Sequence, residues 1–232
     1  ENAGQGQVFR CFDELSAEQQ ANLLEQASAI DLVEIDLLVK EHVLGDGTHA
    51  GGSEDVEPAG YIPLVANGGS AEEWRQAREA GEEALRAGRV AAFVVAGGQG
   101  TRLGFDEPKG TFPVTPIAKK SLFQVFAEKI QAASQRFGRD IPWFVMTSKV
   151  NHADTVAFFE RNDFFGLSRD SVRFFSQGLM PAVDQEGKII LGAKDSIALS
   201  PDGHGGSLRA LVRSGCVDFM KERGIDILSY FQ

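Results

Sequence analysis

The spacing of apolar residues changes near residue 89 of this 232-residue chain. Before that point apolar positions recur at helical intervals, as in the series Leu23, Leu24, Ala27 and Ile30. Ser16 and Gln19 have the spacing of a capping box and predict the start of that helix. The same pattern predicts helices over residues 32–43 and 71–87. Residues 1–88 are therefore expected to form a helical N-terminal segment, with a glycine- and acid-rich loop at 45–60.

Beyond residue 89, short apolar runs alternate with helical patterns. Continuous apolar runs of this length are typical of buried parallel strands, and they occupy residues 90–96, 143–147, 172–175 and 225–231. Helices are predicted after Ser121, which has Gln124 at capping-box spacing, after Asn151 as a cap, and over 207–213 and 217–223. This alternation predicts an α/β, Rossmann-like fold with a mostly parallel sheet over residues 89–232. Ligands should bind beyond the carboxyl ends of its strands.

Composition and charge narrow the class of protein. Hydrophobic residues make up 43% of the chain and charged residues 24%, which suits a protein with a buried core. The net charge of −10 argues against non-specific binding of nucleic acid. No apolar run has the length of a membrane span, and no signal-peptide pattern opens the chain. Cys11 and Cys216 lie far apart without metal or redox spacing, which favours reduced thiols and a cytoplasmic location.

The strongest chemical signal follows the first predicted strand. Residues 97–104 read Gly-Gly-Gln-Gly-Thr-Arg-Leu-Gly, and residues 107–110 read Glu-Pro-Lys-Gly. Glycines leave backbone N–H groups free to approach a phosphate or a base closely. Arg102 and Lys109 supply positive charge that the acidic chain lacks overall.

Three other interpretations of this run are weaker. A dinucleotide fingerprint would need a glycine at position 103, where the chain has Leu103, and an acidic residue ending a second strand about 20 residues further on. A P-loop would need Gly-Lys-Ser or Gly-Lys-Thr after the glycines. A plain tight turn explains a glycine pair, but not four glycines with an arginine and a proline-anchored lysine. A hydride-transfer enzyme nevertheless stays open as an alternative class.

The run resembles the nucleotide-binding signature of the eukaryote-type UDP-sugar pyrophosphorylases, especially those that act on UDP-N-acetylglucosamine. Their Ala-Gly-Gly-Gln-Gly-Thr-Arg-Leu-Gly pattern stands complete here at 96–104, and their Pro-Lys-Gly at 108–110. Other stretches also resemble parts of this family and occur in the family's order. They are residues 12–16, 29–31, 141–148, 174–182 with 187–190, and 200–206 with 209–211. The resemblance implies a GT-A-like nucleotidyltransferase core whose C-terminal part is missing from this chain, which begins with Glu1 rather than Met.

The resemblance also implies roles for particular residues. The backbone of Ala96, Gly97 and Gly98 holds uridine. The triphosphate contacts Gly100, Thr101 and Arg102, and Lys109 neutralises phosphate charge in the transition state. Gln177 and Gly203 recognise uracil, and an amide such as Gln177 can both donate to and accept from the uracil edge. A buried structural amide is the other interpretation of Gln177.

His204 departs from the resembled family, whose second glycine loop has asparagine at that position. A neutral imidazole can still donate one hydrogen bond, so His204 is expected to be a nucleotide-binding position with altered ribose or sugar contacts. An uninvolved loop histidine is the alternative. His42, His49 and His152 have no ligand spacing and are interpreted as surface residues.

The implied reaction joins UTP to a sugar 1-phosphate and releases pyrophosphate, with Arg102 and Lys109 as the catalytic cations. N-acetylglucosamine 1-phosphate is the expected sugar substrate; glucose 1-phosphate and a UTP-binding module without turnover are the alternatives. Mg²⁺ is the expected cofactor because it bridges phosphates, and its aspartate ligand is expected beyond Gln232. The isolated chain is accordingly expected to be inactive.

Overall fold

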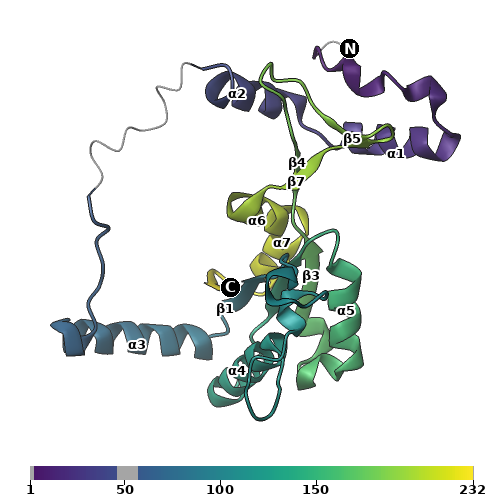
Figure 1. Cartoon of the computed structure of the whole chain (residues 1–232). Helices are drawn as coiled ribbons and strands as arrows, with labels where there is room; N and C mark the ends of the chain where they lie inside the picture. Colours follow the sequence, from purple (N-terminus) through teal and green to yellow (C-terminus); the bar gives the residue numbers. More distant parts are fainter. Residues whose placement is uncertain (1–2, 46–56, 232) are drawn as a thin grey trace. The chain divides into compact units, whose positions relative to one another are not determined.

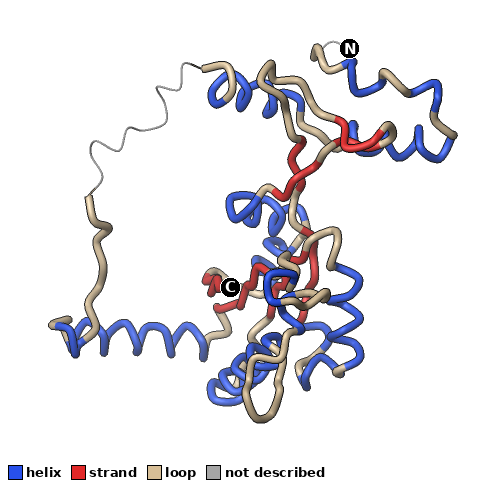
Figure 2. Tube along the Cα trace, viewed as in Figure 1, coloured by secondary structure: helices blue, strands red, loops and turns tan. Residues whose placement is uncertain are grey.

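The computed structural model describes residues 3–45 and 57–231, and its contacts divide the chain into two compact units. Unit 1 comprises residues 1–61 and 179–201, and unit 2 comprises 62–178 and 202–232. Figures 1 and 2 show the elements of each. The expected change of organisation at residue 89 lies inside unit 2, because Leu85 of the preceding helix packs against the main core of that unit. Most of the predicted glycine- and acid-rich loop lies outside the described residues.

Unit 1 is helical with two small antiparallel ribbons. Its helices are α1 (Ala17–Ser28) and α2 (Leu32–His42), and α1 begins with the predicted capping box of Ser16 and Gln19. The ribbons pair β4 (Leu179–Pro181) with β7 (Leu199–Pro201), and β5 (Leu191–Ala193) with β6 (Ser196–Ile197). Its core joins both parts of the chain, with Val8, Leu15, Leu23, Ile189 and Ile197 buried together. Residues 179–201 therefore pair into ribbons and contribute buried side chains to this core.

Unit 2 contains a four-stranded parallel sheet in the order β3-β2-β1-β8. The strands are β1 (Val90–Val95), β2 (Trp143–Thr147), β3 (Val172–Ser176) and β8 (Ile227–Phe231), so all four predicted strands are confirmed. Every pairing is parallel, as the strand–helix alternation predicts.

Helices cover both faces of this sheet (Figure 1). On one face α4 (Leu122–Phe137) and α5 (His152–Arg161) pack with Ala92 and Val94 of β1. On the other, α6 (Gly203–Arg213) and α7 (Cys216–Glu222) pack with Ala91 and Phe93. Alternate residues of β1 thus enter two different cores, the period of two that a strand imposes. The remaining helix, α3 (Ala71–Arg86), precedes β1.

Three local predictions need correction. Ser121 caps α4 through its hydroxyl, but Gln124 bonds to Glu128 and does not complete a capping box. Asn151 stands before α5 without capping it through its side chain. The helix predicted from Ser207 begins earlier, at Gly203. Burial of the helix face that follows stabilises the first turn despite its glycines.

Candidate nucleotide-binding site

The glycine run continues directly from β1 and then folds back on itself. The Ala96 N–H donates to the Met146 carbonyl at 2.7 Å, extending the β1–β2 pairing by one residue. The chain then reverses, so that the Gly100 N–H donates to Glu107 at 3.0 Å and the Lys109 N–H donates to the Gly98 carbonyl at 3.1 Å. This antiparallel return places Lys109 beside Gly98: a Cβ built on Gly98 would lie 3.8 Å from Nζ of Lys109.

This reversal of the chain leaves consecutive backbone N–H groups without hydrogen-bond partners. Among the described residues, the N–H groups of Gly97, Gly98 and Gln99 have no hydrogen-bond partner. Successive free amides in a tight turn form a concave site for an anion or a carbonyl oxygen. A cavity of about 180 Å³ lies against this turn and is lined in part by Ala96, Gly98 and Lys109. The turn can therefore receive a polar, electron-rich ligand.

Two cations lie in the segments next to the turn. Arg102 lies in the short 3-10 helix Thr101–Leu103, which also contains Thr101 and follows Gly100. Both Arg102 and Lys109 are exposed, and neither forms an ion pair with a carboxylate in the described part of the chain. In a protein of net charge −10, unpaired cations beside free amides favour phosphate over other ligands.

Gln177 contacts the glycine turn from the end of β3. Its N–H donates to the Thr147 carbonyl at 2.8 Å, which extends the β2–β3 pairing. Its side-chain amide lies against Gly97 so closely that a Cβ there would be 2.8 Å from Oε1. That amide has no hydrogen-bond partner among the described residues and is only half-buried, so it is available to a ligand. The structure thus brings Gln177 and Gly97 together from positions 80 residues apart in sequence.

Gly203 and His204 occupy the first turn of α6. The Asp202 N–H donates to the Gly178 carbonyl at 3.2 Å, which connects this turn to the segment carrying Gln177. Gly203 has a φ of 65°, a left-handed conformation that glycine adopts without strain. His204 is exposed and its Nδ1 forms a hydrogen bond with the hydroxyl of Tyr230 on β8. A ligand role for Gly203 and His204 stays a prediction.

The other histidines differ in their exposure to solvent. His42 is exposed, as predicted, and His49 lies outside the described residues. His152 is not a plain surface residue: it is half-buried and its Nδ1 forms a 2.7 Å hydrogen bond with Thr147 Oγ1. The sequence could not show this contact because it depends on the conformation of the short turn between β2 and α5.

The described residues do not fit a magnesium site held by protein ligands. No cluster of three or more His, Cys, Asp or Glu side chains within that part of the chain could hold a metal ion. One buried carboxylate oxygen, Oδ1 of Asp202, has no hydrogen-bond partner. It is enclosed between Gly178 and Gly206, where added Cβ atoms would lie 2.2 Å from Oδ2 and 1.8 Å from Cγ of Asp202. One enclosed carboxylate does not make an octahedral site, so the magnesium dependence stays a prediction.

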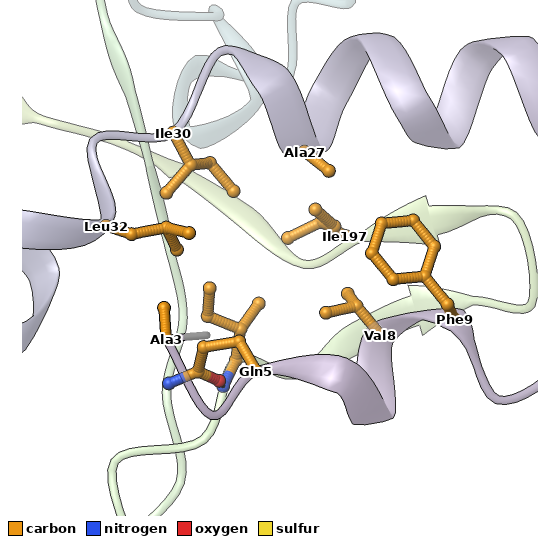
Figure 3. Close-up of a pocket in the computed structure, with 9 residues that line it drawn as sticks. Ala3, Gln5, Val8, Phe9, Ala27, Ile30, Leu32 and Ile197 are labelled. Carbon is orange, nitrogen blue, oxygen red and sulfur yellow. The ribbon is translucent and has the colours of Figure 1, made fainter. Parts of the chain in front are cut away.

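A larger cavity of about 530 Å³ lies in unit 1 and is chemically different (Figure 3). Mainly apolar side chains point into it, among them Val8, Phe9, Ile30 and Ile197. Its one polar side chain, Gln5, already donates to Gly187 and accepts from the Ile189 N–H. This cavity therefore offers no free polar group for a nucleotide.

Free amides, unpaired cations and an available amide side chain, gathered beyond the carboxyl ends of parallel strands, define a Rossmann-like nucleotidyltransferase domain. The chain belongs to the UTP–glucose-1-phosphate uridylyltransferase family, whose sequence model matches residues 68–230. No helix among the described residues is both long and apolar enough to cross a membrane.

Comparison with individual proteins agrees with this family. The chain is 37% identical over 238 residues to UDP-N-acetylglucosamine pyrophosphorylase of Saccharomyces cerevisiae, covering 96% of this chain and 49% of the relative. It is also 37% identical over 243 residues to UDP-N-acetylhexosamine pyrophosphorylase-like protein 1 of Xenopus tropicalis, covering 100% and 47%.

A solved structure of a similar protein agrees with this family. The crystal structure of UDP-N-acetylglucosamine pyrophosphorylase from Trypanosoma brucei, in complex with an inhibitor, is 28% identical with a TM-score of 0.81, and the match covers 98% of this chain and 49% of that one. The chain thus spans about half the length of the relatives it matches.

Proposed function

We propose that this chain is the nucleotide-binding part of a uridylyltransferase that joins UTP to N-acetylglucosamine 1-phosphate and releases pyrophosphate. The observation that carries the proposal is the set of unused donors at the end of β1: three free backbone amides with Arg102 and Lys109 beside them. The choice of sugar is supported by the names of the Saccharomyces cerevisiae relative and of the Trypanosoma brucei structure reported above.

The proposed reaction is an in-line displacement at phosphorus. An oxygen of the sugar phosphate attacks the α-phosphorus of UTP, and the bond from that phosphorus to the bridging oxygen of the β-phosphate breaks. Pyrophosphate leaves with the electron pair. No general base is needed because the nucleophile is already an anion. Catalysis then consists of positioning by the glycine turn and neutralisation of charge by Arg102 and Lys109.

Base selection follows from the contact between Gln177 and Gly97. An amide can donate to one uracil oxygen and accept from the ring N–H, while a free backbone amide donates to another oxygen. Cytosine presents the reverse pattern at two of these positions. The proposed site therefore discriminates UTP from CTP by leaving polar groups unpaired with the wrong base.

A substrate panel tests the proposal. The full-length protein is incubated with UTP and N-acetylglucosamine 1-phosphate, glucose 1-phosphate or no sugar, and pyrophosphate release is measured. We expect release with N-acetylglucosamine 1-phosphate at a higher kcat/KM than with glucose 1-phosphate. A preference for glucose 1-phosphate would support the second candidate, which the family description favours. Binding of UTP without release in any reaction would indicate a binding module.

Two accompanying properties complete the proposal. We expect pyrophosphate release to require added Mg²⁺, which loss of release after chelation and recovery on adding Mg²⁺ would show. We also place the protein in the cytoplasm, a location supported by the free thiols of Cys11 and Cys216. Burial raises the pKa of the Cys216 thiol, so that thiol stays protonated and takes no part in the chemistry.

A further inference from the structure

Asn151 is a fully buried polar residue whose contacts lead to the glycine turn. It is 0% exposed and stands just before α5, but its side chain does not cap that helix. Instead its Oδ1 accepts the Ser148 N–H at 2.8 Å, and its own N–H donates to the Ser148 hydroxyl at 3.2 Å. Its Nδ2 donates to the carbonyl of Ala96 at 3.0 Å and to that of Gly98 at 3.4 Å.

These two carbonyls determine the direction of the neighbouring amides. In a planar trans peptide the C=O and the following N–H point in opposite directions. The Ala96 and Gly98 carbonyls both point toward Asn151, so the N–H groups of Gly97 and Gln99 point away from it. Those N–H groups belong to the set without partners among the described residues. One buried amide thus orients two of the donors that the candidate site offers.

The turn that contains Asn151 also holds Gln177. Thr147, at the start of this turn, accepts the Gln177 N–H through its carbonyl at 2.8 Å. Its hydroxyl donates to the Phe175 carbonyl at 3.1 Å. Residues 147–151 therefore contact both sides of the candidate site, the glycine turn through Asn151 and the Gln177 segment through Thr147.

We propose that Asn151 is a positioning residue for UTP binding: it holds the Ala96 and Gly98 carbonyls inward so that the Gly97 and Gln99 amides face the ligand. The inference rests on the proposed function, and it names a residue that touches no substrate. Replacing its Nδ2 donor by an oxygen would set a carboxylate against two carbonyls while keeping the bond from the Ser148 N–H. The turn would then relax and its amides would lose their common direction.

The test compares Asn151→Asp with Asn162→Asp in the full-length protein. Asn162 is the matched control because its Nδ2 also donates to a carbonyl, that of Phe158, at the other end of α5 and away from the turn. We expect Asn151→Asp to raise the Kd and KM for UTP by about tenfold or more. We expect kcat at saturating UTP to fall less than the affinity for UTP, since the cations that neutralise charge are unchanged. The control should leave all three values near those of the parent.

Amide hydrogen exchange provides a second measurement that does not depend on any ligand. The Lys109 amide, which bonds to the Gly98 carbonyl, should exchange about tenfold faster in Asn151→Asp, while the Ala92 amide in β1 stays protected. If the parent binds no UTP, the proposed function and the role of Asn151 in UTP binding both fail, and this measurement then decides only whether Asn151 orders the glycine turn. If Asn151→Asp does not fold, Asn151→Ser serves in its place, because serine is too short to reach both carbonyls. Unchanged Lys109 exchange together with unchanged UTP affinity in a folded variant overturns the proposal.

Discussion

Arg102 and Lys109 are both free cations beside the glycine turn, but they differ in how they are fixed. The Lys109 backbone is fixed by its own N–H, which donates to Gly98, whereas Arg102 lies on an exposed 3-10 turn. A guanidinium can donate to two phosphate oxygens at once. Such an interaction strengthens as charge develops on the leaving pyrophosphate, so it acts mainly on the transition state.

Arg102→Ala should therefore lower turnover far more than it weakens UTP binding. The expected loss in kcat corresponds to about 3 kcal/mol, comparable to removing one donor to a developing oxyanion. Steady-state kinetics of pyrophosphate release and direct titration of UTP separate the two effects. Arg161→Ala is the control, because Arg161 is an exposed arginine on α5. Unchanged turnover in Arg102→Ala would contradict the assignment.

Gln177→Ala should relax the choice of base. The half-buried amide lies against Gly97, and its loss leaves a ligand's polar groups without partners at a cost of about 1–3 kcal/mol. UTP, CTP and TTP are compared by kcat/KM in variant and parent. Gln76→Ala, which changes an exposed glutamine on α3, controls for loss of an amide elsewhere. An unaltered order of preference would assign Gln177 to structure.

At the scale of elements, the spacing of apolar residues predicts the secondary structure. All four strands of the parallel sheet and most helices follow from apolar spacing, because each buries a defined face against a core. The candidate site was predictable where the signal is contiguous, as in residues 96–104. The role of Asn151 was not predictable, because an asparagine before a helix has the same local pattern whether it caps that helix or, as here, donates to a loop 55 residues away.

An ion pair joins the segments that lead into β1 and β8. Arg89, just before β1, donates three hydrogen bonds to Asp226, just before β8, the shortest at 2.6 Å. The Arg89 guanidinium lowers the pKa of the Asp226 carboxyl below its ordinary value of 3.8. A carboxyl with a lowered pKa in the folded state stabilises the fold above its unfolded pKa, and this contribution is lost as pH falls through the folded pKa.

Arg89→Gln should therefore lower the free energy of unfolding at pH 7 and pH 5, by an amount that shrinks as pH falls through the folded pKa of Asp226. Urea unfolding of parent and variant at each pH gives the difference. The effect should shrink in high salt, because both side chains are exposed and screened. A difference that is the same at every pH would mean that Arg89 acts through packing of its aliphatic part instead.

At the scale of the whole molecule, the chain leaves unit 2 after Gly178 and returns to it at Asp202. The intervening residues 179–201 complete the core of unit 1, where Ile189 and Ile197 are buried with Leu23. The spacing of apolar residues could not predict this packing. A ribbon has the same local pattern whether it packs on nearby residues or on residues more than 150 positions earlier in the chain. Every residue of the candidate site lies in unit 2.

Leu23→Ala should consequently destabilise unit 1 without changing UTP affinity. Leu23 is 0% exposed in a small core, and removal of such a side chain typically costs about 2–5 kcal/mol. Both tryptophans, Trp74 and Trp143, belong to unit 2, so tryptophan fluorescence follows that unit while far-UV circular dichroism follows both. Leu23→Ala should add an early transition to the circular dichroism curve and leave the fluorescence midpoint unmoved.

Phe159→Ala is the matched variant in unit 2, since Phe159 is equally buried in the core under α5. It should lower the fluorescence midpoint and weaken UTP binding, because the core beneath α5 supports the turn that holds residues 96–98. A fluorescence midpoint that falls in Leu23→Ala as far as in Phe159→Ala would show that the two units unfold together. In that case UTP affinity should also fall in Leu23→Ala, and the division of the chain into two energetic units would be wrong.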